Sequence, residues 1–211
     1  MPELKSEATE IDGKTFQKVS FDKCSFTYKP GEPQIPMLSI MLGIPKTSEP
    51  SASVINTTNS LLNGYNLPLV KDDALESSHE NTDFIRASGF YPSELVKIMP
   101  MGYMRQQRVA RLEIYPIQYN ASNAQLKVYK SLKIGVTFGK LAPSSINQTS
   151  AKIRPNTNES KIYEDIYKDS LLNYDQAKKW RMSILVPPSN GSIEESQALE
   201  SELQDSVLPF L

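Results

Sequence analysis

The chain has 211 residues, of which 39% are hydrophobic and 22% are charged, and its net charge is −1. This composition is typical of one sizeable globular domain with an appendage, and it disfavours nucleic-acid and polybasic membrane-surface binding. The longest apolar runs, such as MLSIMLGIP, are far shorter than the roughly 18 residues that a membrane-spanning helix needs. We therefore expect no nucleic-acid partner and no membrane span.

The sequence contains one cysteine and one histidine, Cys24 and His79. It therefore cannot form an internal disulfide or a Cys/His zinc cluster, and we expect neither metal nor cofactor. A catalytic Cys–His pair is disfavoured, because Cys24 lies in a strand-like stretch and His79 in an acidic, polar loop. The familiar nucleophile, phosphate-loop and metalloprotease motifs are also absent. We expect no catalytic residues and predict that this chain is not an enzyme.

The first part of the chain reads as a series of strands. KTFQKVSFD, at residues 14–22, has the β-branched and aromatic content of a strand. A proline-rich loop follows and leads into an apolar strand that ends at Pro45, because prolines exclude a helix there. Short strands are expected at residues 52–58 and 61–67, before an acidic, serine-rich loop at residues 72–81.

The strongest pattern is a two-residue period over residues 103–139, interrupted by the turn sequence NASNA. Before the turn the alternating apolar positions are Ala110, Leu112 and Ile114. After the turn they are Leu126, Val128, Leu132, Ile134, Val136 and Phe138, with Tyr129 on the opposite, polar face. We interpret the stretch as one long antiparallel hairpin, with two unrelated edge strands as the alternative. One apolar face per strand predicts a mainly β fold, a two-sheet antiparallel β-sandwich of jelly-roll or immunoglobulin-like type.

The composition changes after this β-rich part, which we take as a domain of residues 1–139. Residues 140–160 are rich in Ser, Asn, Thr and Pro and read as a linker. Residues 161–211 are expected to form a C-terminal helical segment, broken near Asn173. A second helix should start at Ser192, where Glu195 completes a capping box, and continue to Val207. The apolar end LPFL suggests that the chain is part of a longer protein.

Three segments in this order carry a family resemblance: GEPQIPMLSIMLGIP, MGYMRQQRVARLEIYPIQYNASNAQLKVYKSLKIGVTFG and LLNYDQAKKW. Over residues 14–180 the chain resembles the propeptide of gingipain-type, caspase-like cysteine peptidases and their secretion-associated relatives. The resemblance implies a β-sandwich prodomain that precedes a catalytic domain, assists its folding and blocks its cleft until proteolysis. The implied partner is the cognate peptidase domain in cis, and residues 161–211 would be the junction toward that domain.

The resemblance also implies a location and functional residues. The protein would be secreted or on the surface of a bacterium, although the N-terminus lacks the pattern of a signal peptide. In the family a basic loop side chain can enter the specificity pocket, and Arg105 is the matching position, with Gln106 where relatives have glycine. Otherwise Arg105 is an ordinary surface charge. Exposed-looking basic residues give the processing candidates Lys152, Lys179 and Arg181.

Two other functions remain open. A free-standing surface- or carbohydrate-binding β-sandwich would use an exposed aromatic platform, for which ten tyrosines and one tryptophan provide material. A hydrolase with an unrecognised pair of carboxylates would need both of them in one deep pocket.

Overall fold

The computed structural model describes residues 3–11, 13–71, 89–140, 161–182 and 206–208. Strands dominate the first two-thirds of the chain, and two helices and a short strand follow them. The strands are β1 (Lys5–Ile11), β2 (Lys14–Ser20), β3 (Ser25–Phe26), β4 (Pro36–Gly43), β5 (Ser48–Asn63), β6 (Val96–Met104), β7 (Gln107–Ile114), β8 (Ile117–Asn120), β9 (Gln125–Lys140) and β10 (Ser206–Leu208). The helices are α2 (Lys161–Ser170) and α3 (Tyr174–Met182).

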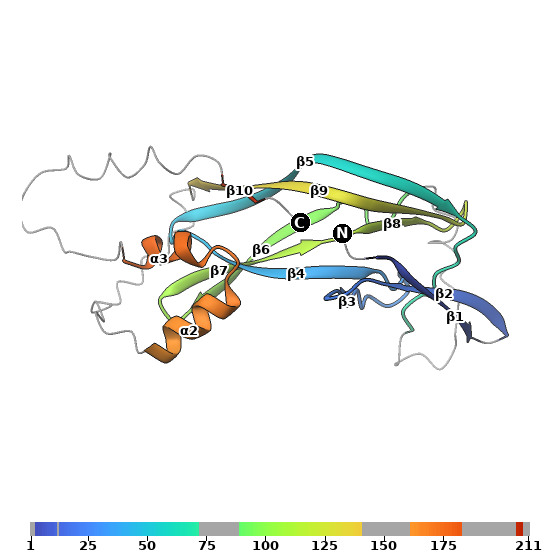
Figure 1. Ribbon diagram of the computed structural model, residues 1–211, viewed down its shortest axis with the longest axis horizontal. Coiled ribbons are helices and arrows are strands. Elements are labelled where there is room, and N and C mark those ends of the chain that lie inside the picture. The colour runs from blue at the N-terminus through green and yellow to red at the C-terminus, as the bar shows by residue number, and fades with distance from the viewer. Residues whose placement is uncertain (1–2, 12, 72–88, 141–160, 183–205, 209–211) are drawn as a thin grey trace, which may run out of the picture.

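Two antiparallel sheets face each other, as Figure 1 shows. One has the order β3-β4-β7-β6, and in the other β9 pairs with β5, β8 and β10. Their facing sides bury one apolar cluster, which includes Leu42, Leu112, Ile114, Leu132, Ile134 and Val136. Because each strand alternates, its inner residues fill the space between the sheets. The predicted mainly β sandwich with helices near the C-terminus is confirmed.

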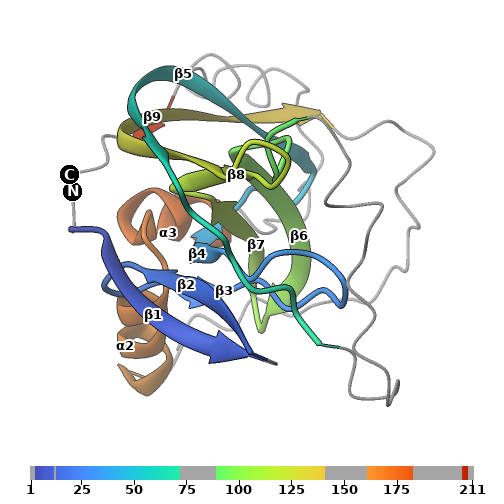
Figure 2. The same ribbon diagram turned by 90° about the vertical axis from the view of Figure 1, so that its right-hand side faces the viewer.

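A separate hairpin of β1 and β2 closes one end of the sandwich (Figure 2). It is attached through Gln17, whose backbone N–H donates to the Asn66 carbonyl at 2.7 Å and whose side-chain oxygen accepts from the Asn66 N–H at 2.6 Å. Beneath it lies a second core, formed by Val19, Phe21, Ile35, Leu67, Ile117, Tyr119, Leu126 and Val128. The strand predicted at residues 14–22 is thus present as β2.

The prediction of one long hairpin over residues 103–139 is wrong. β7 pairs with β6 and β4, whereas β9 pairs with β5 and, over its first residues, with β8. The chain changes sheets between Ile114 and Ile117, next to Pro116, which has no N–H to continue a ladder. The two short strands expected at residues 52–67 are also a single strand, β5, through residue 63.

Tyr129 lies inside, although the alternation predicts it on the polar face. The ladder of β5 and β9 shifts register where Thr58 pairs with Ser131 and Asn59 with Tyr129, so Lys130 has no partner. Such a β-bulge reverses the alternation locally. Tyr129 is 5% exposed, and its hydroxyl donates to the side-chain oxygen of Gln118 at 2.5 Å.

The crossing from β4 to β5 is held by Arg108 of β7. Its Nη1 donates to the carbonyl oxygens of Pro45 at 3.3 Å and Lys46 at 3.2 Å, and also to that of Ser48. Backbone carbonyls in a tight crossing would otherwise lack partners, and one guanidinium can satisfy several of them. Arg108 therefore fixes the corner between the two sheets.

The helices α2 and α3 cover the outer side of β4 and β7 at one end of the sheet, as Figure 1 shows. They bury a third cluster of Val109, Tyr167, Leu171 and Ala177. Their break, residues 171–173, confirms the interruption predicted near Asn173. No helix among the described residues is long and apolar enough to cross a membrane.

The loop between the helices completes the exposed edge of β4. The Leu172 N–H donates to the Met41 carbonyl at 3.0 Å. The side-chain amide of Asn173 then bonds both polar groups of Gly43, accepting from its N–H at 2.8 Å and donating to its carbonyl at 2.9 Å. β3 covers only the first residues of β4, so this loop supplies the partner that the rest of the edge needs.

The second helix, predicted for residues 192–207, falls almost entirely outside the described residues. Its last part is described, and there the prediction is wrong. Ser206–Leu208 forms the strand β10, which pairs antiparallel with Ile134–Val136 of β9.

Gly43→Ala should detach the helical tail. A Cβ at position 43 would lie 2.3 Å from the Cβ of Ala177, so α3 must move. We expect a loss of about 1–3 kcal/mol in the free energy of unfolding, measured by urea denaturation. Gly139→Ala is the control, because its Cβ would meet only the Glu49 carbonyl at an ordinary 3.5 Å. Equal stability of the two variants would contradict this account of the tail.

Candidate functional site

The turn between β6 and β7 carries Arg105. Met104 pairs with Gln107, so Arg105 and Gln106 alone form the turn. Arg105 has a φ of +51°, in the left-handed region that costs a residue with a side chain about 1 kcal/mol. Gly102, with a φ of +100°, lies beside a register shift in β6 just before the turn. The turn is thus a strained and locally bent element, a feature that is common at functional sites.

The helix α2 supports this turn from one side. The guanidinium of Arg105 stacks over the ring of Tyr163, with its carbon 3.8 Å from the ring centroid. The hydroxyl of the fully buried Tyr167 donates to the Met104 carbonyl at 3.1 Å. Both contacts come from one face of α2 and offset the strain at Arg105, whose side chain is exposed to solvent.

Large apolar side chains stay exposed on both elements that meet at the turn. On β6 these are Met101, 52% exposed, and Tyr103, 57% exposed. On α2 they are Ile162, 69% exposed, and Ile166, 42% exposed. Single exposed apolar side chains are common on protein surfaces, so these four do not by themselves identify a contact surface.

The two helices are joined by a cluster around Glu164. Its carboxylate accepts from the Tyr174 hydroxyl at 2.7 Å and from Arg181 Nη2 at 3.0 Å. The Arg181 guanidinium also lies 4.3 Å from the ring centroid of Tyr167. Burial alone would raise the pKa of Glu164, but the hydrogen bonds from Tyr174 and Arg181 and the charge of Arg181 outweigh it and lower that pKa. The cluster therefore favours an ionised Glu164.

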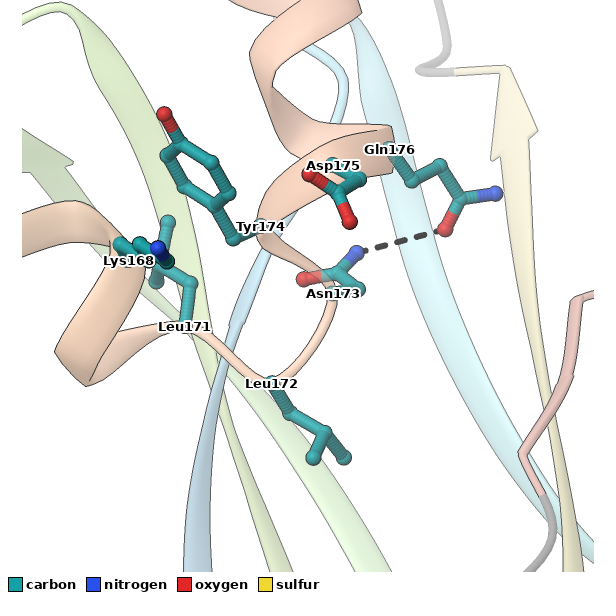
Figure 3. Close-up of a pocket in the computed structure, with 7 residues that line it drawn as sticks. All are labelled: Lys168, Leu171, Leu172, Asn173, Tyr174, Asp175 and Gln176. Atoms are coloured by element: carbon teal, nitrogen blue, oxygen red, sulfur yellow. Dashed lines mark hydrogen bonds between the residues drawn. The ribbon is translucent and has the colours of Figure 1, made fainter. Parts of the chain in front are cut away.

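A depression lies beside the loop that joins the helices, with a volume of about 400 Å³ (Figure 3). Its lining residues are Lys168, Leu171, Leu172, Asn173, Tyr174, Asp175 and Gln176. Asp175 is the one carboxylate among them, so the depression does not supply the pair that a hydrolase would need. Asn173, which reaches Gln176 at 3.4 Å here, is engaged with Gly43 and has a structural role.

The other candidate chemistries also lack a site in the described part of the chain. Burial raises the pKa of the Cys24 thiol, which disfavours the nucleophilic thiolate, and His79 lies outside the described residues. No group of three His, Cys, Asp or Glu side chains in the described ranges could hold a metal ion. The exposed tyrosines Tyr28 and Tyr103 lie at opposite ends of one sheet and form no aromatic platform.

Comparison with protein families decides what the chain is. The family model Propeptide_C25 matches residues 1–181. The chain belongs to the Propeptide_C25 family. It is a propeptide of the gingipain type, and the resemblance inferred from its sequence is confirmed.

Curated relatives and solved structures agree with this assignment. Lys-gingipain and Lys-gingipain 381, both of Porphyromonas gingivalis, are 28% identical over 148 residues, which cover 64% of this chain and 9% of each relative. This propeptide thus spans less than a tenth of their length. A structure on the zymogenic latency of gingipain K from the same organism aligns with a TM-score of 0.56 and 26% identity over 65% of this chain and 82% of that one.

A complex of the pro- and mature domains of RgpB, also from Porphyromonas gingivalis, shares the fold. It aligns with a TM-score of 0.64 and 20% identity over 83% of this chain and 89% of that one. Membership of the Propeptide_C25 family implies a non-catalytic prodomain of a peptidase precursor.

The structure separates the candidate residues of this propeptide. Arg105 lies at the turn tip, and Lys179 is exposed on α3. Arg181 is 7% exposed and paired with Glu164, so a protease could reach it only after α3 has come loose. Lys152 lies outside the described residues. Sequence reasoning missed the bracing role of Tyr163 and Tyr167, because a four-residue spacing indicates a shared helix face but not what that face contacts.

Acid should loosen the helical tail of this propeptide through Glu164. A lowered pKa means that the contribution of Glu164 to stability is complete above pH 4.5, its ordinary pKa, and is lost as pH falls through the lower folded value. Trp180, the sole tryptophan, packs edge-on against Phe138 with ring centroids 5.1 Å apart, so its fluorescence reports the docking of α3.

Glu164→Gln should weaken docking at pH 7 by about 1–2 kcal/mol and flatten the fluorescence change below pH 4.5. Asp165→Asn, at an exposed position on the same helix, should leave both properties unchanged. Identical acid titrations of Glu164→Gln and the wild type would show that another group controls docking.

Proposed function

We propose that this chain is the inhibitory prodomain of a gingipain-type cysteine peptidase, acting in cis until proteolysis removes it. The turn between β6 and β7 would enter the active-site cleft, with Arg105 as the anchor in the specificity pocket. The observation that carries the proposal is the position of Arg105, exposed at the tip of a strained turn that α2 braces.

The geometry of the turn suits binding without cleavage. Clefts bind peptides in extended form, and β6 and β7 present extended backbone on both sides of the tip. At Arg105 the left-handed φ bends the chain away from that path, so the bond after Arg105 is not presented as substrate would be. Because α2 holds the tip in advance, less conformational entropy is lost on binding.

Arg105 can leave Tyr163 for a pocket at small cost. An exposed cation–π contact stabilises by about 0.5–1 kcal/mol. A buried arginine anchor at an interface contributes about 2 kcal/mol or more, since its planar charged group forms several hydrogen bonds. A pocket contact of this kind would exceed the stacking contact on Tyr163, which would orient the side chain beforehand.

The proposal has two further parts. The prodomain would assist the folding of the catalytic domain, for which its large preformed surface provides a template. The precursor would be secreted or held on the bacterial cell surface, because the family resemblance implies an exported zymogen. Expression of the catalytic domain with and without this chain tests the first part, because a folding aid must raise the yield of active enzyme.

Arg105→Ala should raise the inhibition constant of the chain, added in trans to its cognate peptidase, by about 30-fold. Lys133→Ala, an exposed charge on β9 in the other sheet, should change it little. Trp180 fluorescence checks that both variants keep their fold. An unchanged constant for Arg105→Ala would leave Arg105 a brace for α2 and remove it as the anchor.

Processing should depend on Lys152 and Lys179 more than on Arg181. We expect a precursor with Lys152→Ala and Lys179→Ala to accumulate uncut, and a precursor with Arg181→Ala to be cut, because the Arg181 side chain is buried. Mass spectrometry of the fragments identifies the cut bonds. Accumulation of uncut Arg181→Ala precursor alone would reverse this assignment.

A further inference from the structure

One edge of β9 is completed by a segment from far along the chain. β5 pairs with β9 along its whole length, from Lys140 to Gln125. On the other edge, β8 covers Gln125–Val128 and β10 covers Ile134–Val136 (Figure 1). In the described part of the chain, nothing else pairs with that stretch of β9.

This edge lies directly over the core between the sheets. Ile134 is fully buried and Val136 is 2% exposed. An uncovered edge would present unpaired N–H and C=O groups beside buried apolar side chains, which is the arrangement that recruits foreign strands. The edge is therefore a strand-addition site, and β10 occupies it in this structure.

The occupant comes from outside the region that the family model covers. That match ends at residue 181, whereas β10 consists of Ser206–Leu208. The last strand of the propeptide sandwich is thus supplied by the chain that follows the propeptide match.

We infer that β10 is a connection-dependent strand, which docks on β9 while the chain is continuous and leaves when the chain is cut between residues 179 and 206. A three-residue antiparallel ladder forms only a few backbone hydrogen bonds, each with a modest net gain. As a separate peptide it would bind with a dissociation constant on the order of 1 mM or weaker. A covalent connection supplies an effective concentration of similar order, about 1 mM, so docking needs that connection.

Only the release of β10 by processing rests on the proposed function. If processing cuts this connection, the edge of β9 at Ile134–Val136 becomes free at that moment, and the cut propeptide differs in structure from the propeptide within the zymogen. The docking itself does not depend on inhibition.

Hydrogen exchange on the full chain tests the docking. A recognition sequence for a specific protease is inserted after Gly191, and exchange of the amides in Ile134–Val136 that face β10 is measured before and after cutting. We expect exchange about twofold faster after the cut and in intact Val207→Pro than in the intact wild type, because equal effective concentration and dissociation constant leave the strand docked about half of the time and proline disfavours the ladder. Val207→Ala is the control and should stay slow.

Each contrary result has a definite meaning. Equally slow exchange in Val207→Pro would show that β10 is not the partner of this edge and would overturn the inference. Slow exchange that survives the cut would overturn the dependence on the connection. Protection that rises with protein concentration would identify a second copy of the chain as the occupant instead.

A disulfide gives a second measurement. In a Cys24→Ser background, Gly135→Cys with Val207→Cys should cross-link, because positions 135 and 207 are directly paired. Gly139→Cys with Val207→Cys is the mismatched control. The cross-linked chain should keep slow exchange after the cut. Because neither assay contains the cognate peptidase, failure of the Arg105 experiment would leave these results standing, and the reverse also holds.

Discussion

The helical tail depends on one pair of hydrogen bonds, in which the side-chain amide of Asn173 bonds both polar groups of Gly43. An amide side chain there imitates the next strand of the sheet, and the missing side chain of Gly43 lets α3 approach. Because α3 is fixed in this way, α2 lies beside the turn that carries Arg105. The conformation of the turn tip is therefore set by contacts at the edge of a different strand.

The sequence predicted which faces of the strands are buried far better than which strands are neighbours. A two-residue period is the same for one strand and for two strands in different sheets, so it could not reveal the change of sheet at Pro116. Nor could it place Tyr129, because a bulge in the neighbouring ladder decides its side. Arg105 was found only through resemblance, and its contact with Tyr163 joins residues far apart in the chain.

A prodomain of the proposed kind has to bind firmly and yet be removable. In this chain the helical tail of α2 and α3 contributes to both binding and removal. α2 braces the turn through Tyr163 and Tyr167, while α3 carries the exposed Lys179. The braces and the helix that a protease would open share the cluster around Glu164, so unfolding α3 for cleavage would also withdraw support from the turn.

Two of the crossings between the sheets have a mechanical consequence. One lies at residues 44–47 and is held by Arg108, and the other lies at Pro116, at the opposite end of β7. The chain therefore connects the two sheets covalently at both ends of β7. These two crossings would resist sliding of one sheet over the other when force is applied to the C-terminal tail. The sandwich should therefore separate from a bound peptidase domain without unfolding.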